Sequence, residues 1–269
     1  MDSRLEANLD NWNNRVPVHA QSRFYDVEGW LSAAPGPPQR ELEALGDLQD
    51  KTLIHLQCHF GMDTLQWARA GATVTGLDFS PVAIDKANSL AERAGLTERA
   101  SFVCADVYDA PQALSGRRYD VVYVSLGALC WLPNVAAWGA VVAELLTPGG
   151  RLYLHDGHPF TSCFDDDGEL IVYSYFEEPD DPFVSDSSST YTDGDALNAI
   201  RTYEWSHSVG EIVAALVGHG LVLDSLTEHD WTLFRRFPWL EESPSGVLVT
   251  PEGRPRIPLS FTLLAHAPD

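Results

Sequence analysis

The chain has 269 residues, of which 45% are hydrophobic, and a formal net charge of -22 at pH 7. This length can bury the core of one domain, while the apolar runs are too short and too interrupted to span a bilayer. With only two lysines, Lys51 and Lys86, the acidic surface repels nucleic-acid phosphates and anionic lipids, so we expect neither nucleic acid nor a membrane as partner.

Residues 1–50 are expected to be helical and rich in loops. They carry Trp12, Phe24, Tyr25 and Trp30 and end in a proline-rich stretch at 35–38. The first residues, MDSRLEANLDNWNNR, lack the basic region and apolar run of a signal peptide, so export is not expected. We treat 1–50 as a helical segment that precedes a main domain at 51–269.

Strands and helices alternate along residues 52–156. We predict strands at 52–57, 72–77, 100–104, 119–124 and 151–155, and helices at 62–70, 81–94 and 134–146. Such alternation with short turns predicts an α/β fold with a parallel sheet and helices on both faces. Ligands of these sheets bind at the carboxyl ends of the strands.

Residues 160–205 differ in composition from the sequence around them. They are acidic, rich in Tyr, Ser and Pro, and contain no Lys or Arg between Arg151 and Arg201. We interpret this stretch as an insertion in which 168–176 and 196–205 pair as antiparallel strands across a connection at 180–195. An amphipathic helix at 208–219 and two strands at about 221–228 and 258–266 are predicted to complete the chain.

The four cysteines, Cys58, Cys104, Cys130 and Cys163, show no paired spacing. Cys58 and Cys104 fall at predicted strand ends, where buried free thiols are common. This pattern is typical of a reduced protein, so we expect a cytoplasmic location.

The most informative segment is 52–80. An apolar run enters a turn closed by Gly61, a helix follows, and a second apolar run ends on Asp78. A carboxylate about 20 residues beyond such a turn accepts hydrogen bonds from ribose hydroxyls, which predicts a nucleoside-containing cofactor. A dinucleotide-dependent oxidoreductase fits the same pattern, although the turn lacks the G-x-G-x-x-G of that class.

Over residues 52–156 the chain resembles a class I S-adenosylmethionine-dependent methyltransferase. Only Gly61 remains of the three glycines that this family favours in the turn, and His55 stands where an acid is common. LQCHFGMDTLQWA is similar to a bacterial subgroup of small-molecule methyltransferases with an LQCHFG-type turn, as are VPVHAQSRFYDVEGW, LCWLP, HP and YEWSHSVGEIV. The resemblance implies a Rossmann-like sheet of seven strands, mostly parallel with an antiparallel closing hairpin, and residues 1–50 as a lid.

The resemblance also implies S-adenosyl-L-methionine as the cofactor and assigns its contacts. Backbone groups of the turn approach the methionine moiety, at Leu56, Gln57, Cys58 and Gly61. Asp78 binds the ribose, and Phe79 flanks the adenine. The segment whose Asp caps the adenine amine corresponds to Ala105, Asp106 and Val107, and the floor beneath the sulfonium corresponds to Ser125 and Leu126. Asp78 and Asp106 are also placed to cap the helices that follow them, so this alternative stays open.

Three residues are candidates for contact with the methyl acceptor or for catalysis. His158 is the first, because the loop after a parallel strand faces the site, and His19 and Tyr25 of the implied lid follow. A base is needed only when the acceptor carries a proton of high pKa. No metal is expected, because the cluster His155/Asp156/His158 lacks further ligands and the turn cluster His55/Cys58/His59 is used by the cofactor.

We therefore predict an enzyme that methylates a small, partly apolar molecule at a thiol, a phenolic or carboxylic oxygen, or an amine. A protein that binds the cofactor without catalysis is an alternative, because two turn glycines are missing. An NAD-dependent oxidoreductase is a second alternative. The sequence carries no signal for an oligomeric state.

Overall fold

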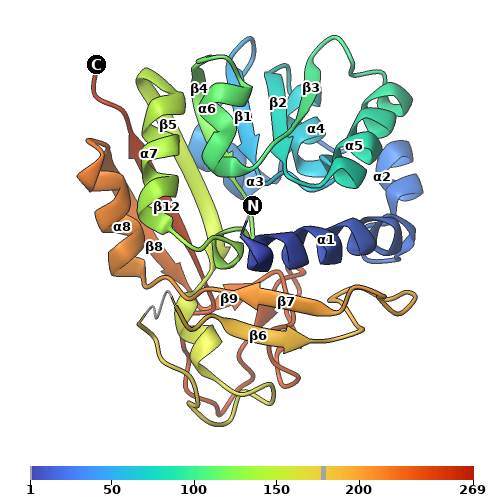
Figure 1. Ribbon diagram of the computed structural model, residues 1–269, viewed down its shortest axis with the longest axis vertical. Coiled ribbons are helices and arrows are strands. Elements are labelled where there is room, and N and C mark those ends of the chain that lie inside the picture. The colour runs from blue at the N-terminus through green and yellow to red at the C-terminus, as the bar shows by residue number, and fades with distance from the viewer. Residues whose placement is uncertain (1, 177–179) are drawn as a thin grey trace.

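The structure is a computed structural model that describes residues 2–176 and 180–269. The strands of its central sheet are β1 (Thr52–Leu56), β2 (Thr73–Asp78), β3 (Ala100–Cys104), β4 (Tyr119–Val124), β5 (Leu146–Gly157), β8 (Val222–His229) and β12 (Ser260–His266). Their order is β3-β2-β1-β4-β5-β12-β8. β1 to β5 run parallel, and β12 pairs antiparallel with β5 and β8 (Figure 1), which confirms the predicted sheet.

Helices cover both faces of the sheet, as expected. They are α3 (Gln39–Leu45), α4 (Met62–Arg69), α5 (Pro81–Ala94), α6 (Ala110–Ala113), α7 (Val135–Leu145) and α8 (Val209–Gly218). Val122 and Leu152 pack with α7 and α8 in one core, whereas Val121 and Tyr153 pack with α3 and α4 in another. Because side chains alternate between the two faces of a strand, β4 and β5 must be apolar on both sides.

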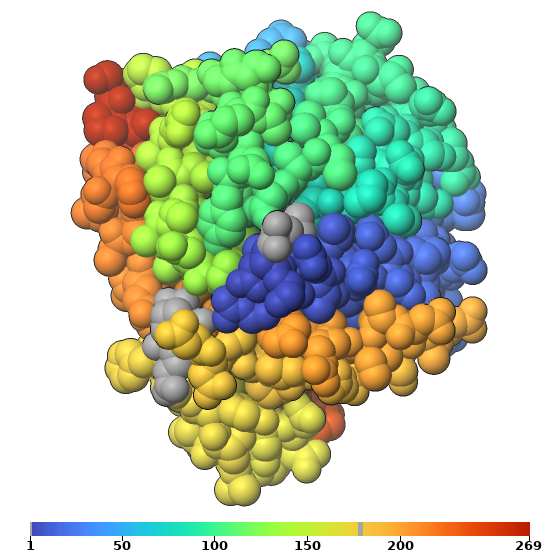
Figure 2. Space-filling view, in the orientation of Figure 1, coloured from blue at the N-terminus to red at the C-terminus, as the bar shows by residue number. Residues whose placement is uncertain are grey.

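The N-terminal region forms α1 (Ser3–Gln21) and α2 (Val27–Ala33). α1 lies across the end of the sheet at which β5 leads into the insertion (Figure 1). On the surface, its residues separate the sheet from the insertion (Figure 2). Asn8 exchanges two hydrogen bonds of 2.8 Å with the backbone of Tyr203. On the other side, the Ser80 hydroxyl donates to Asn13 Oδ1 at 2.7 Å. α1 is therefore attached both to the sheet and to the insertion.

The insertion, residues 160–205, contains an antiparallel pair that differs from the predicted one. β7 (Arg201–Glu204) was expected, but its partner is β6 (Phe183–Asp186) and not the stretch 168–176. Residues 183–186 lie in the segment predicted as a connection, because Asp and Ser usually indicate a loop. Here Asp186 takes part in the strand pairing, because the Arg201 guanidinium donates to both of its carboxylate oxygens at 2.8 and 2.6 Å. The predicted pairing was wrong for this reason.

A second small sheet was not predicted. It joins β9 (Trp231–Thr232), β10 (Glu241–Glu242) and β11 (Leu248–Val249) in the order β10-β11-β9. Strands of two residues carry no alternation that a sequence pattern can detect. The first strand of this sheet, β9, follows β8 directly. Its Trp231 stacks on His155 near the carboxyl end of β5.

The cysteines are free, and one of them departs from the expectation. Cys58 is buried, whereas Cys104, at the end of β3, is exposed. β3 is an edge strand of the sheet, so a residue at its end has a neighbouring strand on one side only. The prediction of a buried thiol at Cys104 was therefore wrong.

Candidate active site

The turn after β1 has a left-handed backbone at three positions, although only one of them is a glycine. Gln57 has φ +56°, His59 has φ +51° and Gly61 has φ +79°. A positive φ is uncommon for residues with a Cβ, because the side chain crowds the backbone. The three positions at which the resembled family favours glycine thus retain the left-handed conformation. The Gln57 amide also donates to the Ala128 carbonyl at 2.8 Å, which joins the turn to the loop after β4.

Replacing Gln57 by glycine should give a more stable protein than replacing it by alanine. Both variants lose the bond to Ala128, but only alanine keeps the strained φ, so the free energies of unfolding should differ by about 1 kcal/mol in favour of glycine. Urea denaturation measures this difference. Gln66, inside α4, is the matched control, because there alanine should be the more stable by a similar amount. An advantage of alanine at both positions would contradict the expectation.

Asp78 ends β2 and points into the same turn. It is 7% exposed, and its carboxylate accepts hydrogen bonds from the backbone N–H of His59 at 2.8 Å and of Ser80 at 2.9 Å. Burial raises its pKa to about 6, although these bonds act in the opposite direction. The helix-cap role belongs to the Ser80 side chain, which accepts from the N–H of Ala83. Asp78 is thus a buried carboxylate that fixes the turn and faces the space above it.

A cavity of about 340 Å³ lies at the carboxyl ends of the parallel strands. The predicted cofactor residues that line it are Gln57, Cys58, Gly61, Asp78, Phe79, Ala105, Asp106, Val107, Ser125 and Leu126. Leu56 is the exception, because it is fully buried in the core shared with α7. The sequence therefore brings ten of these eleven residues to one cavity.

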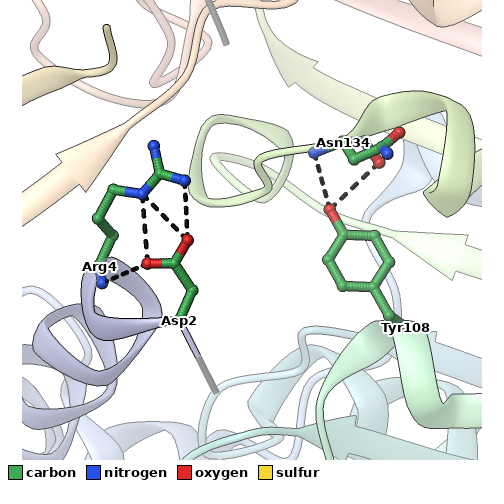
Figure 3. A network of polar contacts seen from close by, with 4 residues as sticks. All are labelled: Asp2, Arg4, Tyr108 and Asn134. Carbon is green, nitrogen blue, oxygen red and sulfur yellow. Dashed lines mark hydrogen bonds and ion pairs between the residues drawn. The ribbon is translucent and has the colours of Figure 1, made fainter. Parts of the chain in front are cut away.

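One end of the cavity is walled by Asp106 and Tyr108. Asp106 caps the short helix η1 (Val107–Asp109) by accepting from the Tyr108 N–H at 3.0 Å. The Tyr108 hydroxyl donates to the Asn134 carbonyl at 3.1 Å and accepts from its N–H at 2.9 Å (Figure 3). This wall is thereby fixed to the start of α7. Both the capping role and the cavity-lining position of Asp106 are present in the structure.

Beyond the turn, a polar chain runs under the cavity at the end of β4. Ser125 Oγ lies 3.1 Å from His55 Nε2, and His55 Nδ1 lies 2.8 Å from Thr64 Oγ1. Ser125 also donates to the Asp63 carboxylate at 3.4 Å. Burial lowers the pKa of His55 to about 3 and raises that of Asp63. His55, the residue in the place of the usual acid, is therefore a neutral hydrogen-bonding group.

Of the lid candidates, Tyr25 lines the cavity and His19 lies behind it. His19 is fully buried, and its Nδ1 lies 3.0 Å from Nε2 of His59, which does line the cavity. Burial, followed by the charge of Arg15, lowers the pKa of His19 to about 3. The Tyr25 hydroxyl lies 2.6 Å from that of Tyr191, and burial raises its pKa well above the usual value. All these groups are neutral near pH 7.

The structure does not bring His158 to the cavity. Its side chain is 4% exposed, its Nε2 lies 2.8 Å from the Glu228 carboxylate, and its Nδ1 accepts from the Phe160 N–H at 3.1 Å. One ring nitrogen thus holds the loop after β5 against β8, and the other caps the short helix η3 (Pro159–Cys163) in that loop. The strand β5 itself supplies a cavity residue, His155, three positions earlier.

Several residues of the cavity were not predicted. They include Arg40, Glu41, Asp63, Leu233 and Phe234. Most of these residues come from segments outside the alternating region, where the strand-end rule gives no position. His155 belonged to the polar stretch 155–158 considered after the fifth predicted strand, although His158 was preferred, and period-two alternation along β5 places His155 on the same face as Tyr153. Glu41, in α3, accepts a bond of 2.7 Å from the Tyr123 hydroxyl, and burial raises its pKa to about 7.

Two kinds of feature are absent from the described ranges, 2–176 and 180–269. No group of three His, Cys, Asp or Glu side chains in these ranges is arranged to hold a metal ion. No helix in them has both the length and the apolar character needed to cross a membrane.

Comparison with known proteins adds to this geometry. Residues 54–150 match the model of a family described as a methyltransferase domain. The ubiquinone biosynthesis O-methyltransferase of Serratia proteamaculans is 30% identical over 136 residues, which are 49% of this chain and 55% of that protein. A rice (Oryza sativa subsp. japonica) protein named "Probable tocopherol O-methyltransferase, chloroplastic" is 24% identical over 91% of this chain and 67% of its own length.

Among solved structures, an S-adenosylmethionine-dependent methyltransferase of Mesorhizobium loti superposes with a TM-score of 0.54. It is 18% identical, and the alignment covers 84% of this chain and 96% of that one. The matched residues 54–150 contain the turn after β1, Asp78, Asp106 and Ser125. The matches confirm the predicted fold, and residues 54–150 are similar to a methyltransferase domain.

Proposed function

We propose that this protein transfers a methyl group from S-adenosylmethionine to a small, partly apolar molecule, and that it is a member of the bacterial subgroup with an LQCHFG-type turn. The observation that carries the proposal is one continuous cavity that begins at the buried carboxylate of Asp78 and continues past Ser125 between aromatic side chains. Among the acceptor atoms considered, oxygen is favoured by the O-methyltransferase names of the two relatives. The net charge of -22 supports a small molecule, not a nucleic acid, as partner.

The chain's own residues fit the proposed cofactor. Asp78 has two oxygens that already accept backbone N–H groups and still have free lone pairs for ribose hydroxyls. Asp106 and Phe79 take the adenine end, and the backbone of Gln57 to Gly61 takes the methionine end. When bound, S-adenosylmethionine supplies a methyl group on positively charged sulfur, and Ser125 and Leu126 form the floor beneath it.

The remaining residues position the acceptor and exclude water. Trp12, Phe24 and Tyr25 come from the N-terminal segment and Tyr191 from the insertion, and all line the cavity. We infer that residues 1–50 act as a lid in this way. His59 and Tyr25 are neutral and supply hydrogen bonds, so acceptors that ionise without a strong base, such as phenols, carboxylic acids and thiols, suit this site. Positioning and desolvation then account for much of the rate enhancement.

Incubation with methyl-labelled S-adenosylmethionine and a panel of phenols, aromatic carboxylic acids, thiols and amines tests the proposal. We expect labelled product from at least one class, together with binding of S-adenosylhomocysteine by calorimetry. Tight binding of that product without transfer to any class would favour a non-catalytic binding protein. Thermal stabilisation by NAD and not by S-adenosylhomocysteine would instead favour an oxidoreductase.

A further inference from the structure

The strand order arranges the cavity residues along a line. Asp78 ends β2, Gln57 follows β1, Ser125 follows β4 and His155 lies in β5. These four strands are neighbours in the sheet, in the order β2-β1-β4-β5. Neighbouring strands are about 4.8 Å apart. With the proposed ribose site at Asp78 and the sulfonium floor at Ser125, the end of β5 is the position left for the acceptor. This inference therefore rests on the proposed function.

His155 presents an unused polar atom at this end of the cavity. The residue is 4% exposed, and its Nδ1 lies 2.9 Å from Thr262 Oγ1. Its Nε2 is buried and has no hydrogen-bond partner among the described residues. Burial, with the charge of Arg40 next in weight, lowers its pKa to about 3, so the ring is neutral. A buried polar atom without a partner is costly unless a ligand satisfies it.

The ring nitrogen that carries the proton of His155 depends on the Thr262 hydroxyl, which His155 shares with His229. Thr262 Oγ1 also lies 2.9 Å from His229 Nε2. A hydroxyl has one proton and two lone pairs, so it can donate to one of the two rings and accept from the other. When it donates to His155 Nδ1, the proton of His155 is on Nε2, which is then available as a hydrogen-bond donor. The pair can thus present an N–H to an acceptor oxygen without a change in net charge.

Arg40 adds a positive charge at the same place. It lines the cavity with His155, and its guanidinium carbon lies 5.7 Å from the ring centre of Trp231, which stacks on His155. Its Nε is buried and has no hydrogen-bond partner in ranges 2–176 and 180–269. Glu41 accepts from Tyr123 and Asp63 accepts from Ser125, and neither acid hydrogen-bonds to Arg40 among the described residues. Burial raises the pKa of both acids, although the charge of Arg40 acts to lower it.

We propose that Arg40 and His155 form the subsite for an anionic oxygen of the acceptor, and that the acceptor is an aromatic carboxylate or phenolate. A guanidinium in a partly dry cavity favours an anion, and the planar fork of Arg matches a carboxylate. Phe234 and Leu233 line the cavity from the chain after β9 and suit the aromatic ring. The surface outside the cavity is acidic, so the positive charge of Arg40 distinguishes this subsite from its surroundings.

Calorimetric titration of three probes tests this subsite: 3,4-dihydroxybenzoate, 4-nitrocatechol and catechol, with and without saturating S-adenosylhomocysteine. We expect both anionic probes to bind at least about tenfold more tightly than catechol. The variant Arg40→Gln should lose this preference, Arg40→Lys should retain part of it, and His155→Leu should reduce it. The affinity for S-adenosylhomocysteine should stay within about threefold in every variant.

The exposed Arg117 provides the charge-matched control, because Arg117→Gln removes one positive charge outside the cavity. It should leave the preference unchanged. Equal binding of anionic and neutral probes to the unaltered protein would overturn the subsite. So would a loss of S-adenosylhomocysteine affinity in Arg40→Gln with the preference intact, because Arg40 would then hold the cofactor. Titrations without S-adenosylhomocysteine report on the subsite even if no methyl is transferred, so the two proposals fail separately.

Discussion

The Asp78→Ala variant should lose S-adenosylhomocysteine affinity by at least about 100-fold. A hydrogen bond to a charged group contributes about 1.5–3 kcal/mol, and a ribose diol offers two of them to this carboxylate. The turn also loses the acceptor for the N–H groups of His59 and Ser80. Calorimetric titration measures the change, and circular dichroism at the same temperature verifies that the variant is folded.

The exposed Asp85 of α5 is the matched control, because Asp85→Ala removes the same charge from the next helix. Its affinity should equal that of the unaltered protein. The pH gives a second readout. Burial raises the pKa of Asp78 to about 6, so the carboxylate is charged above that pH and becomes protonated below it. Affinity should therefore be about tenfold lower at pH 5 than at pH 7. Unchanged affinity in Asp78→Ala would remove the basis of the proposed function.

The Asp156→Asn variant should be strongly destabilised. Asp156 is 5% exposed and accepts four backbone N–H groups, from Gly127 at 2.6 Å, Ala128 at 3.2 Å, Leu129 at 3.0 Å and Gly157 at 2.7 Å. An amide NH₂ in place of one oxygen leaves about two of these donors unsatisfied, which costs about 3 kcal/mol of the free energy of unfolding. For a chain of this size Tm should fall by roughly 6–12 °C.

Asp165 serves as the comparison for this effect. It also accepts backbone N–H groups, from Glu169 at 2.8 Å and Leu170 at 3.2 Å, but in the exposed part of the insertion. Water can replace these bonds, so Asp165→Asn should cost less than about 1 kcal/mol. Because Asp156 holds the loop after β4 that lines the cavity, Asp156→Asn should also weaken S-adenosylhomocysteine binding. Equal stability losses in the two variants would show that burial of Asp156 does not matter.

The sheet could be predicted because its strands carry their own signal. β4 and β5 are apolar on both faces, and the turns between elements contain Gly or Pro, so local patterns and the parallel topology agree. The hairpin of the insertion could not be predicted in the same way. The ion pair between Arg201 and Asp186 is a contact between segments, and the composition of Asp186 and its neighbours indicates a loop when read alone.

The candidate site also divides into a part with a local sequence signal and a part that depends on contacts between distant segments. The cofactor end follows from the rule that ligands bind at strand ends, and Asp78, Asp106 and Ser125 all line the cavity. The acceptor end combines α3, β5 and the segment after β9, so no local pattern connects Arg40 with His155. His158 was favoured over His155 because β5 was predicted to end at 155, whereas the strand continues to Gly157.

The bond between Tyr25 and Tyr191 has a consequence for traffic into the cavity. These two residues lie 166 positions apart, and their hydroxyls meet at 2.6 Å where the N-terminal segment adjoins the insertion. Parting one such hydroxyl pair costs only about 1 kcal/mol net. Separating the two segments here also requires the His19–Thr190 hydrogen bond and the Arg23–Asp193 ion pair to part, so several weak polar contacts together control this side of the cavity.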